Sequence, residues 1–447
     1  MGLNRVISTD DRRYVITDPI SDVLADKLKL IDHGEPFACP IQDLVIDASL
    51  DGQERDLLGK IGLGRSLSIV CDANTYDVLG ARIARALSSA DVIISDAKAA
   101  DEDAVEALMA KARHVSTLIA VGSGTINDIV KLASHRRGTA YAVFATAPSM
   151  NGYVTATASI SRHGQKLSLP ATPPIGAFFD LAILANAPMR LLRAGVGDSL
   201  CRSTAEFDWR LSHQLLETPF FEIPFTIQAA DEADLLSRIG DLRNRDIDAV
   251  KTLTRLLILG GLGMLLTGNS QPGSQGEHLI SHYIDMLSTT HQGSLHGEQV
   301  GLATWTMSAL QHQMLDQESA PLLLETAIDA KALNDCFGPL SEACGQALRA
   351  KTPKGDHRDR LNRHLHDQWP ACRSVLKERS LSHRRLREAF DIMEIKTDPE
   401  ALGLSRAFYR DAVLQSRALR DRFTALDLAA MTGTLDAFID NHLPFNR

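Results

Sequence analysis

Short apolar runs alternate with amphipathic stretches along the first third of the chain. The apolar runs have the length of buried strands and lie at 66–71, 91–95, 117–121 and 140–145. Helical spacing of apolar residues follows them at about 72–87, at 101–112 and at 126–134. Short strands that alternate with helices predict a doubly wound parallel sheet, so we expect an α/β fold for this part of the chain.

The pattern changes before the middle of the chain. A polar stretch at 155–169 and an apolar run at 175–179 predict a β-hairpin that closes the α/β part. Helical spacing then continues to the C-terminus, with a strongly apolar helix at 249–266 that contains closely spaced glycines. We therefore predict two domains, an α/β nucleotide-binding domain at 1–185 and an all-α domain at 186–447.

Composition narrows the class of protein. The chain has 447 residues, of which 44% are hydrophobic and 23% charged, as in ordinary globular proteins of two or three domains. A net charge of −9 without a long basic run argues against nucleic acid or an anionic membrane surface as a partner. We expect no signal peptide and no membrane span, because no apolar run is long enough. Scattered cysteines without a CxxC pair suit reduced thiols, so we expect a cytoplasmic protein.

Three features of the α/β part suggest a nucleotide-binding site. One is a strand-to-helix turn made of Gly122, Ser123, Gly124 and Thr125, where the free N–H groups of a helix start attract phosphate. The turn lacks the GxGxxG and GxxxxGK[ST] spacings, so its glycines could also serve only a tight turn. Asp72 follows another strand and could bond ribose hydroxyls or, equally well, cap the next helix. A loop at 146–152, TAPSMNG, follows a third strand, and such loops line ligand crevices.

Histidines at helical spacing suggest a metal site in the second half. His278 and His282 are four residues apart and project from one face of a helix, and His296 follows after a polar loop. Asp198, which follows Gly197, could complete the site or could only cap a helix. A carboxylate with imidazoles suits a catalytic divalent metal, and zinc, nickel and iron all accept such ligands. The alternative is a set of unrelated surface histidines.

At these residues the chain resembles the sn-glycerol-1-phosphate dehydrogenase family, within the iron-containing alcohol dehydrogenase and dehydroquinate synthase-like superfamily. The resemblance runs in order along most of 66–310 and again near 405–435. It rests on the motifs CDANTY at 71–76, GSGTINDIVK at 122–131, TAPSMNG at 146–152, KLSLPATPP at 166–174, AGVGDSL at 194–200, GEHLISHYIDML at 276–287, LHGEQVG at 295–301 and RDRFTALDLA at 420–429.

The resemblance implies an N-terminal α/β domain, an all-α C-terminal domain and an active site between them. It implies Asp198, His278 and His296 as metal ligands and His282 as a histidine beside the substrate. The residues that it implies for NAD(H) or NADP(H) are Asp72 at the ribose, Gly122, Ser123, Gly124, Thr125 and Asp128 around the pyrophosphate, and Thr146 and Ser149 near the nicotinamide.

The implied reaction is the reversible reduction of dihydroxyacetone phosphate to sn-glycerol 1-phosphate. A divalent metal would stabilise charge on the ketone oxygen, and His282 would deliver a proton directly or through water. The acidic Asp72, without a basic cluster beside it, weakly favours NAD over NADP. We expect a small phosphorylated polyol or ketose as substrate, and a homo-oligomer.

Two departures from the family pattern bear on function. The family loop that usually reads TAASHDG here carries Met150 and Asn151, so a substrate-contacting carboxylate is replaced by an amide. The region near 335–400 is longer than the corresponding region of the family and contains basic stretches. We interpret it as a solvated helical insertion rather than a partner-binding surface or a phosphate lid. The alternatives for the whole chain are a dehydroquinate synthase-like lyase that uses NAD catalytically, against which Asp198 argues, and a scaffold without activity.

Overall fold

The computed structural model describes residues 18–26, 38–64, 66–162, 165–288 and 293–442. Its contacts divide the chain into two compact units. The sheet unit comprises residues 1–163, 167–188 and 223–270, and the helical unit comprises 164–166, 189–222 and 271–447. The sequence predicts one boundary, between 185 and 186. In the structure the chain leaves the sheet unit after Pro188 but returns to it for 223–270.

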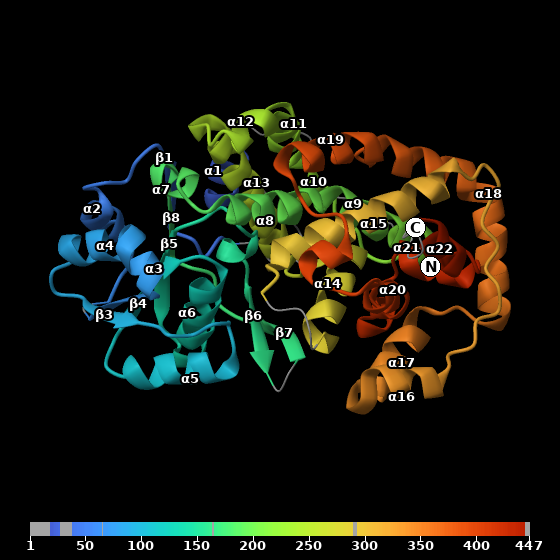
Figure 1. Ribbon diagram of the computed structural model, residues 1–447, viewed down its shortest axis with the longest axis horizontal. Helices are drawn as coiled ribbons and strands as arrows, with labels where there is room; N and C mark the ends of the chain where they lie inside the picture. The colour runs from blue at the N-terminus through green and yellow to red at the C-terminus, as the bar shows by residue number, and fades with distance from the viewer. Residues whose placement is uncertain (1–17, 27–37, 65, 163–164, 289–292, 443–447) are drawn as a thin grey trace. The chain divides into compact units, whose positions relative to one another are not determined.

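A sheet of six parallel strands forms the centre of the sheet unit, in the order β1-β8-β5-β4-β2-β3 (Figure 1). The strands are β1 Asp43–Asp47, β2 Leu67–Cys71, β3 Asp91–Ile94, β4 Thr117–Gly122, β5 Ala140–Ala145 and β8 Gly176–Asp180. The prediction of a parallel α/β sheet is confirmed. The sequence did not predict β1, because an aspartate at each end leaves only three apolar residues in this strand.

Helices surround this sheet and continue after it within the same unit. They are α1 Pro19–Leu24, α2 Glu54–Gly59, α3 Ala73–Thr75, the π-helix η1 Tyr76–Gly80, α4 Ala81–Ala86, α5 Glu102–Lys111, α6 Gly124–Arg137, η2 Gly152–Val154, α7 Leu181–Ala185, α10 Ile223–Thr226, α11 Ala229–Ser237, α12 Ile239–Arg243 and α13 Ile247–Thr267. The predicted hairpin is confirmed for the polar stretch, as β6 Thr157–Arg162 paired with β7 Gln165–Pro170. The apolar run at 175–179, which the sequence assigned to the same hairpin, is instead β8, a parallel strand of the central sheet.

Both faces of the central sheet are buried, which explains why its strands read as nearly continuous apolar runs. On one face, Ile69, Ile119 and Phe144 belong to a core cluster with residues of α2, η1 and α4. The alternate residues of the same strands, such as Leu118 and Val143, are also fully buried, and α6 contacts β4 and β5.

Helix α13 is the apolar helix that the sequence predicts. It is long and apolar enough to cross a membrane by length and composition, but 89% of its most apolar window is buried inside the protein. Its glycines permit close packing: a Cβ on Gly261 would lie 2.5 Å from the backbone oxygen of Asn151, and one on Gly263 would lie 3.0 Å from Cβ of Pro224. The helix is therefore a core element of the sheet unit.

The helical unit contains the remaining helices, which pack around one large apolar core. They are α8 Met189–Leu200, α9 Arg202–Leu216, η3 Gln271–Gly273, α14 Gly276–Leu287, α15 His296–Asp316, α16 Ala330–Phe337, η4 Gly338–Leu340, α17 Ser341–Lys351, α18 Gly355–Arg379, α19 His383–Met393, η5 Pro399–Leu402, α20 Arg406–Gln415, η6 Ser416–Leu419, α21 Ala425–Met431 and α22 Leu435–His442.

The region near 335–400 is helical as predicted, but it is not simply solvated. Helix α18 buries Leu365, Trp369 and Leu376 in the same core as α9, α14 and α15. Lys351, at the start of the basic stretch, is 3% exposed, and its Nζ lies 2.9 Å from Oδ2 of Asp427. The interpretation of this region as a solvated insertion is therefore wrong for one face of its helices, which is part of the core.

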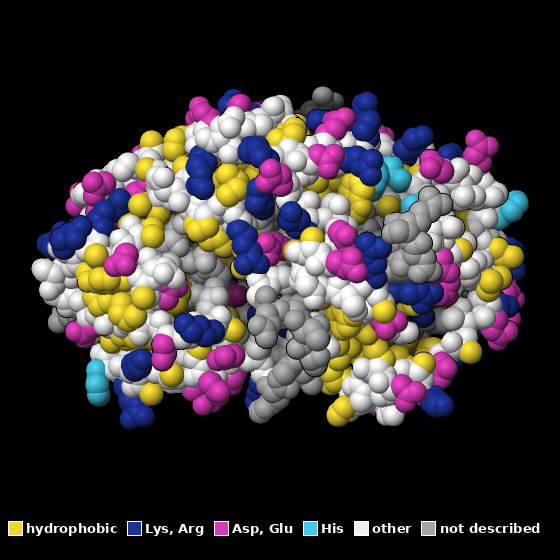
Figure 2. Space-filling model, viewed as in Figure 1, with side chains coloured by type: hydrophobic (Ala, Val, Ile, Leu, Met, Phe, Trp, Pro, Cys, Tyr) yellow, Lys and Arg dark blue, Asp and Glu magenta, His cyan; other side chains and the backbone are white. Residues whose placement is uncertain are grey.

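The charged side chains are mixed on the surface. Figure 2 shows Lys and Arg interspersed with Asp and Glu over the face that it draws. Interspersed charges of both signs partly cancel at a distance, so the local fields on this face are weaker than those of a single-sign patch.

Candidate functional site

The strand order places several predicted cofactor residues at one point of the sheet. Strands β2 and β4 are neighbours, but the chain continues from β2 to β3 on one side and from β4 to β5 on the other, so the order reverses between them. In open parallel sheets, ligands bind at the carboxyl ends of the strands beside such a reversal. Asp72 directly follows β2, Gly122 ends β4 and Ser123 follows it.

Asp72 has a structural role at this point. It is the N-cap of α3, where its Oδ1 accepts a hydrogen bond from the backbone N–H of Thr75 at 2.8 Å. Its own N–H donates to Oγ1 of Thr75 at 3.0 Å, which completes a capping box. The helix-capping alternative is therefore confirmed, and a contact with ribose stays a prediction.

The turn after β4 requires glycine at its first position. A Cβ on Gly122 would lie 2.7 Å from Cβ of Ile126, closer than real Cβ atoms approach. Ser123 is the N-cap of α6, which begins at Gly124. The first N–H groups of a helix have no acceptor within the helix, so this turn offers donors to an anion at the switch point of the sheet.

The loop 146–152 packs against this turn. The backbone N–H of Thr146 donates to the oxygen of Gly122 at 3.1 Å. The sulfur of Met150 lies 3.1 Å from the place that a Cβ on Gly124 would occupy, so the Met150 side chain covers the first residue of α6. The other polar side chains of the loop, which are partly buried, are Ser149 and Asn151. Turn and loop thus form one continuous surface of the sheet unit.

Asp128, which the sequence predicts at the pyrophosphate, binds protein groups. Its Oδ2 accepts a hydrogen bond from the N–H of Ser159 at 3.1 Å, and its Oδ1 accepts one from Nδ2 of Asn127 at 3.1 Å. The residue is 8% exposed. Its observed contacts join α6 to β6, and a contact with cofactor stays a prediction.

In the helical unit, three helices carry the predicted metal ligands. Asp198 lies in the last turn of α8, His278 in the first turn of α14, and His296 is the first residue of α15. The alternative in which Asp198 caps a helix is wrong, because Asp198 lies inside α8, which ends two residues later at Leu200.

Glycines bring α8 and α15 into backbone contact. A Cβ on Gly297 would lie 2.0 Å from the oxygen of Ala194, and one on Gly197 would lie 2.2 Å from the oxygen of Gly297. No side chain fits at either position. Since Asp198 and His296 are the chain neighbours of these glycines, the same contact places both residues side by side.

The three side chains converge. Oδ1 of Asp198 lies 3.8 Å from Nε2 of His278 and 3.8 Å from Nε2 of His296. One ligand atom from each residue lies within 4.8 Å of the others. Atoms that share one tetrahedral ion at about 2.1 Å lie roughly 3.4 Å apart, so a small inward movement would complete coordination.

Each imidazole is oriented by a partner on its other nitrogen. Nδ1 of His278 lies 3.0 Å from Oε1 of Glu277, and Nδ1 of His296 lies 3.3 Å from Oγ of Ser281. The hydroxyl of Ser281 donates to Oε1 of Gln299 at 2.8 Å, so it accepts from His296. Both rings therefore carry their proton on Nδ1 and direct the lone pair of Nε2 toward Asp198, as ligation requires.

A second buried carboxyl group lies behind this arrangement. Burial opposes charge on Glu277, but hydrogen bonds from His278 and from backbone N–H groups outweigh it and lower its pKa. Burial and the charge of Glu277 raise the pKa of Asp208 to about 8, although the N–H groups of Ala425 and Gly276 bond to it. Below about pH 8 the negative charge of the pair therefore resides on Glu277, the carboxylate that orients His278.

His282 lies beside the converging set but outside it. Its ring centroid is 6.3 Å from that of His278. Its Nδ1 is buried and has no hydrogen-bond partner among the residues that the structure describes. Burial, followed by the positive charge that neighbouring histidines and Arg420 would exert, holds the pKa of His282 well below its usual value, so the ring is neutral.

The donor set fits a divalent metal. One carboxylate and two neutral imidazoles suit zinc, nickel or ferrous iron. The side chain of Asp198 is fully buried, whereas that of His296 is 41% exposed, so the set is open on one side. An open position is the mark of a catalytic rather than a structural metal site.

Sequence reasoning missed the residues that orient the two imidazoles. Glu277 adjoins His278, and Ser281 lies three residues after His278 on the same helix. Gln299 likewise lies three residues after His296. The spacing of three residues places Ser281 and Gln299 on the ligand-bearing faces of α14 and α15, which is the signal that could have identified these two. Glu277 shares no such spacing with His278.

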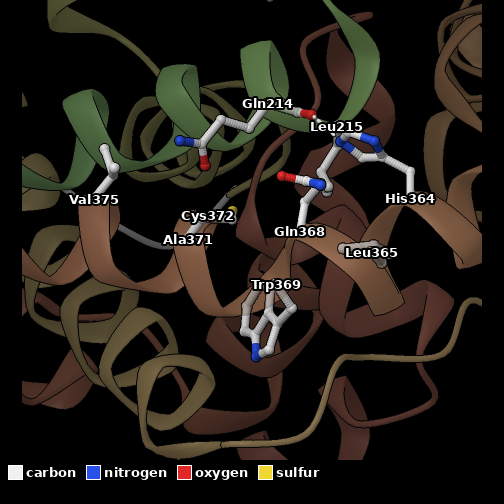
Figure 3. Close-up of a pocket in the computed structure, with 9 residues that line it drawn as sticks. All are labelled: Gln214, Leu215, His364, Leu365, Gln368, Trp369, Ala371, Cys372 and Val375. Atoms are coloured by element: carbon white, nitrogen blue, oxygen red, sulfur yellow. Dashed lines mark hydrogen bonds between the residues drawn. The ribbon is translucent and has the colours of Figure 1, made fainter.

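A pocket elsewhere in the helical unit does not contain these residues. It has a volume of about 240 Å³ and lies between α9 and α18, with mostly apolar walls that include Leu215, Trp369 and Val375 (Figure 3). Nε2 of His364 at its edge donates to the backbone oxygen of Gln214 at 3.1 Å. The pocket therefore brings no group of acid–base or metal chemistry to the candidate site.

Comparison with known proteins bears out the family that the sequence motifs resemble. Residues 45–188 match the family model of iron-containing alcohol dehydrogenases. A glycerol-1-phosphate dehydrogenase [NAD(P)+] of Pyrococcus furiosus is 31% identical over 273 residues, which cover 60% of this chain and 78% of that protein. The enzyme of the same name from Halalkalibacterium halodurans is 33% identical over 256 residues, and the match covers 55% of this chain and 64% of the length of that relative.

Solved structures agree on the fold. Glycerol dehydrogenase from Schizosaccharomyces pombe aligns with a TM-score of 0.60 at 15% identity and covers 91% of this chain and 92% of its own. Sulfoacetaldehyde reductase from Bifidobacterium kashiwanohense, solved in complex with NAD+, aligns with a TM-score of 0.56 at 16% identity and covers 89% and 98%. These structures show the fold alone. The sequence relatives show that the chain belongs to the glycerol-1-phosphate dehydrogenase [NAD(P)+] family, a family of NAD(P)-dependent dehydrogenases of the iron-containing alcohol dehydrogenase type.

Proposed function

We propose that this protein reduces dihydroxyacetone phosphate to sn-glycerol 1-phosphate, or reduces a closely related phosphorylated ketose, with NADH or NADPH. Asp198, His278 and His296 hold one divalent metal in this proposal. The observation that carries it is the convergence of one buried carboxylate and two imidazoles whose outer nitrogens are both engaged. The names of the sequence relatives support the substrate class.

Reduction of a ketone requires a hydride donor and a group that stabilises the charge on the oxygen. The nicotinamide cofactor supplies the hydride that adds to the ketone carbon. A bound divalent metal supplies Lewis-acid stabilisation of the negative charge that develops on the ketone oxygen. The remaining work, which is alignment and proton transfer, belongs to residues of this chain.

The residues of the helical unit prepare this environment. Asp198 and the charge on Glu277 favour a cation between the imidazoles, and Ser281 keeps Nε2 of His296 free of its proton. His282 is neutral, and its unpartnered buried Nδ1 can bond to a substrate hydroxyl or to a water molecule. In the reductive direction, one ring nitrogen of His282 donates its proton to the new alkoxide while the other accepts a proton from water, so the ring stays neutral.

The residues of the sheet unit bind the cofactor in this proposal. The turn from Gly122 to Thr125 supplies backbone N–H groups to the pyrophosphate, as strand-to-helix turns at a switch point do. Thr146 and Ser149 lie on the loop that packs against this turn. Asp72 lies at the adjacent strand end, where a carboxylate favours NADH over NADPH.

The test is NADH oxidation by metal-reconstituted protein, with dihydroxyacetone phosphate and a panel of phosphorylated and free ketoses and aldehydes. Turnover with dihydroxyacetone phosphate supports the proposed substrate and cofactor. Turnover with a different carbonyl compound keeps the mechanism and changes the substrate. Release of a product without net NADH oxidation would instead indicate a lyase in which NAD is recycled.

The substitution Asn151→Asp tests the substrate contact separately. An aspartate restores the carboxylate that the family loop usually carries, so we expect the KM of dihydroxyacetone phosphate to change while the KM of NADH stays the same. Unchanged kinetics with both substrates would remove Asn151 from the substrate pocket.

A further inference from the structure

Lys131 is a buried lysine in the middle of α6. It is 0% exposed, and its Nζ donates to the oxygen of Gly152 at 2.5 Å, to Oγ1 of Thr155 at 3.2 Å and to the oxygen of Thr157 at 3.1 Å. These three acceptors match the three N–H donors of an ammonium group. A buried charge is costly unless it is fully hydrogen-bonded. The three acceptors of Lys131 therefore identify the segment that this side chain stabilises.

All three acceptors belong to the segment that follows Asn151. Gly152 begins η2, Thr155 ends it as its C-cap, and Thr157 begins β6. One turn earlier on α6, Asp128 accepts the N–H of Ser159 in β6. Helix α6 therefore attaches to this segment at several backbone positions and does so through side chains that the proposed chemistry does not use.

Helix α13 also contacts this segment, at Asn151. A Cβ on Gly261 would lie 2.5 Å from the backbone oxygen of Asn151, and one on Gly260 would lie 3.6 Å from Cβ of Asn151. The backbone oxygen of Asn151 is thus in contact with α13, and the next backbone oxygen, that of Gly152, is bonded to Lys131. The two contacts hold the consecutive peptide groups on either side of Gly152.

We propose that Lys131 is a positioning residue that, together with the glycine pair of α13, sets the place of Asn151 and so determines which carbonyl substrate the enzyme accepts. The inference rests on the proposed function in that it takes Asn151 to be a substrate contact. It assigns no direct contact with substrate to Lys131. The sequence signal is the spacing of Asp128 and Lys131, which places both on one face of α6.

The first experiment compares Lys131→Met with Lys351→Met. Both substitutions remove a buried ammonium of similar length, and Lys351 lies in the helical unit, where it binds Asp427. We expect Lys131→Met to raise the KM of the ketone at least tenfold while the Kd of NADH changes less than threefold. We expect Lys351→Met to lower the Tm without changing either constant. Equal KM values for the ketone in Lys131→Met and the wild type would overturn the proposal.

A double-mutant cycle separates positioning from general loosening. If Lys131 acts through Asn151, Lys131→Met has little further effect on the KM of the ketone in an Asn151→Ala background. Effects of the two substitutions that multiply independently would contradict the proposal. Gly261→Ala provides a second route if Lys131→Met does not fold, because its added Cβ presses on the oxygen of Asn151; it should raise the same KM and leave the Kd of NADH unchanged.

Hydrogen–deuterium exchange keeps this inference distinct from the proposed function. Amides at 152–157 should exchange faster in Lys131→Met and at the wild-type rate in Lys351→Met, whatever the substrate. If the wild type reduces a carbonyl compound other than dihydroxyacetone phosphate, the proposed substrate is wrong. The double-mutant cycle is then measured with that other compound, and it still tests the positioning role of Lys131. Unchanged exchange at 152–157 in Lys131→Met would overturn the positioning role, even in an active enzyme.

Discussion

The residues proposed to bind the cofactor in the sheet unit and those proposed to bind the metal in the helical unit are held in place by different means. In the sheet unit, the turn from Gly122 to Thr125 and the loop at 146–152 present backbone groups, and strand ends and one buried lysine set their positions. In the helical unit, Asp198, His278 and His296 present side-chain atoms from three separate helices. Glycine contacts between helices and hydrogen bonds to the imidazoles set those positions.

The difference follows from what each ligand requires. A diphosphate is large and spreads its charge, so several N–H groups at a helix start bind it without exact placement of any side chain. A metal ion needs each ligand atom within a few tenths of an ångström and in the correct protonation state. The helical unit therefore adds Glu277, Ser281 and Gln299 around the ligands, and the sheet unit needs no equivalent set.

The largest expected effect is loss of metal from His278→Ala. The substitution removes a ligand, so metal affinity should fall by more than the roughly 100-fold that loss of an orienting partner costs. Metal content after dialysis measures it, with His312→Ala as a control that removes a histidine outside the set. Wild-type metal content in His278→Ala would show that the three residues do not form the metal site.

Gly297→Ala should have the second largest effect, on stability and on metal binding. Its Cβ would lie 2.0 Å from the backbone oxygen of Ala194. Because backbone cannot move aside as a side chain does, we expect destabilisation of about 3 kcal/mol, at or above the upper end of ordinary overpacking, together with weakened metal binding. Gly240→Ala is the matched control, because its Cβ would meet no atom within 4 Å. Urea denaturation measures the stability of both variants, and equal stabilities would contradict the close contact of α8 and α15.

Glu277→Ala tests the orientation of His278. Loss of the acceptor for Nδ1 should reduce metal affinity about 10- to 100-fold, and Glu277→Gln should recover part of it because the amide oxygen still accepts a hydrogen bond. Competition with a chromophoric chelator measures the affinity. Glu206→Gln, which removes a buried charge bonded to Arg202 and Arg210, is the control. The idea fails if both glutamate substitutions leave metal affinity unchanged.

Gly124→Ala tests the sheet unit with a smaller expected effect. The added Cβ would lie 3.1 Å from the flexible thioether of Met150, which can move, so stability should change by less than about 1 kcal/mol. Closer crowding of the turn should weaken NADH binding about tenfold, which corresponds to about 1.4 kcal/mol. Fluorescence titration with NADH measures the affinity. An unchanged Kd would place the cofactor phosphates away from this turn.

The last test concerns how stability depends on pH, an effect that is spread over several pH units. Asp208 has its pKa raised from 3.8 to about 8. Between these values the folded protein keeps a proton that the unfolded chain releases, so this group's contribution to the free energy of unfolding falls as pH rises, by at most about 1.4 kcal/mol per pH unit. Asp208→Asn should flatten that fall. Denaturation midpoints from about pH 5 to about pH 8 measure it, and parallel curves for both proteins would contradict the raised pKa.

The sequence predicted the elements with strong local signals. The four strands from β2 to β5 and the helices α5, α6 and α13 follow from the pattern of apolar residues, and α14 follows from the spacing of His278 and His282. Strand β1 escaped prediction because its apolar core is only three residues long. Residues 223–270 read as part of a continuous helical region, because their packing in the sheet unit depends on partners distant in sequence.

The sequence likewise identified some features of the candidate site and not others. Residue types and spacing were enough to name the histidines and the Gly122–Thr125 turn as candidates, and the resemblance to the family added Asp198 as a ligand. Spacing alone overestimated one pair, since His278 and His282 share a helix face but the structure joins His278 to His296 and Asp198 instead. Helix periodicity gives the direction of a side chain but not the distance to another helix.

What the sequence by itself determined is the type of each element and the chemistry available to it, because both depend on neighbours along the chain. Only the tertiary structure decided which groups meet. The backbone contact of Gly197 with Gly297, the bonds that orient the imidazoles and the burial of Lys131 beside the Asn151 loop all join residues from different elements. Such contacts arise from packing of the whole unit, which no local pattern encodes.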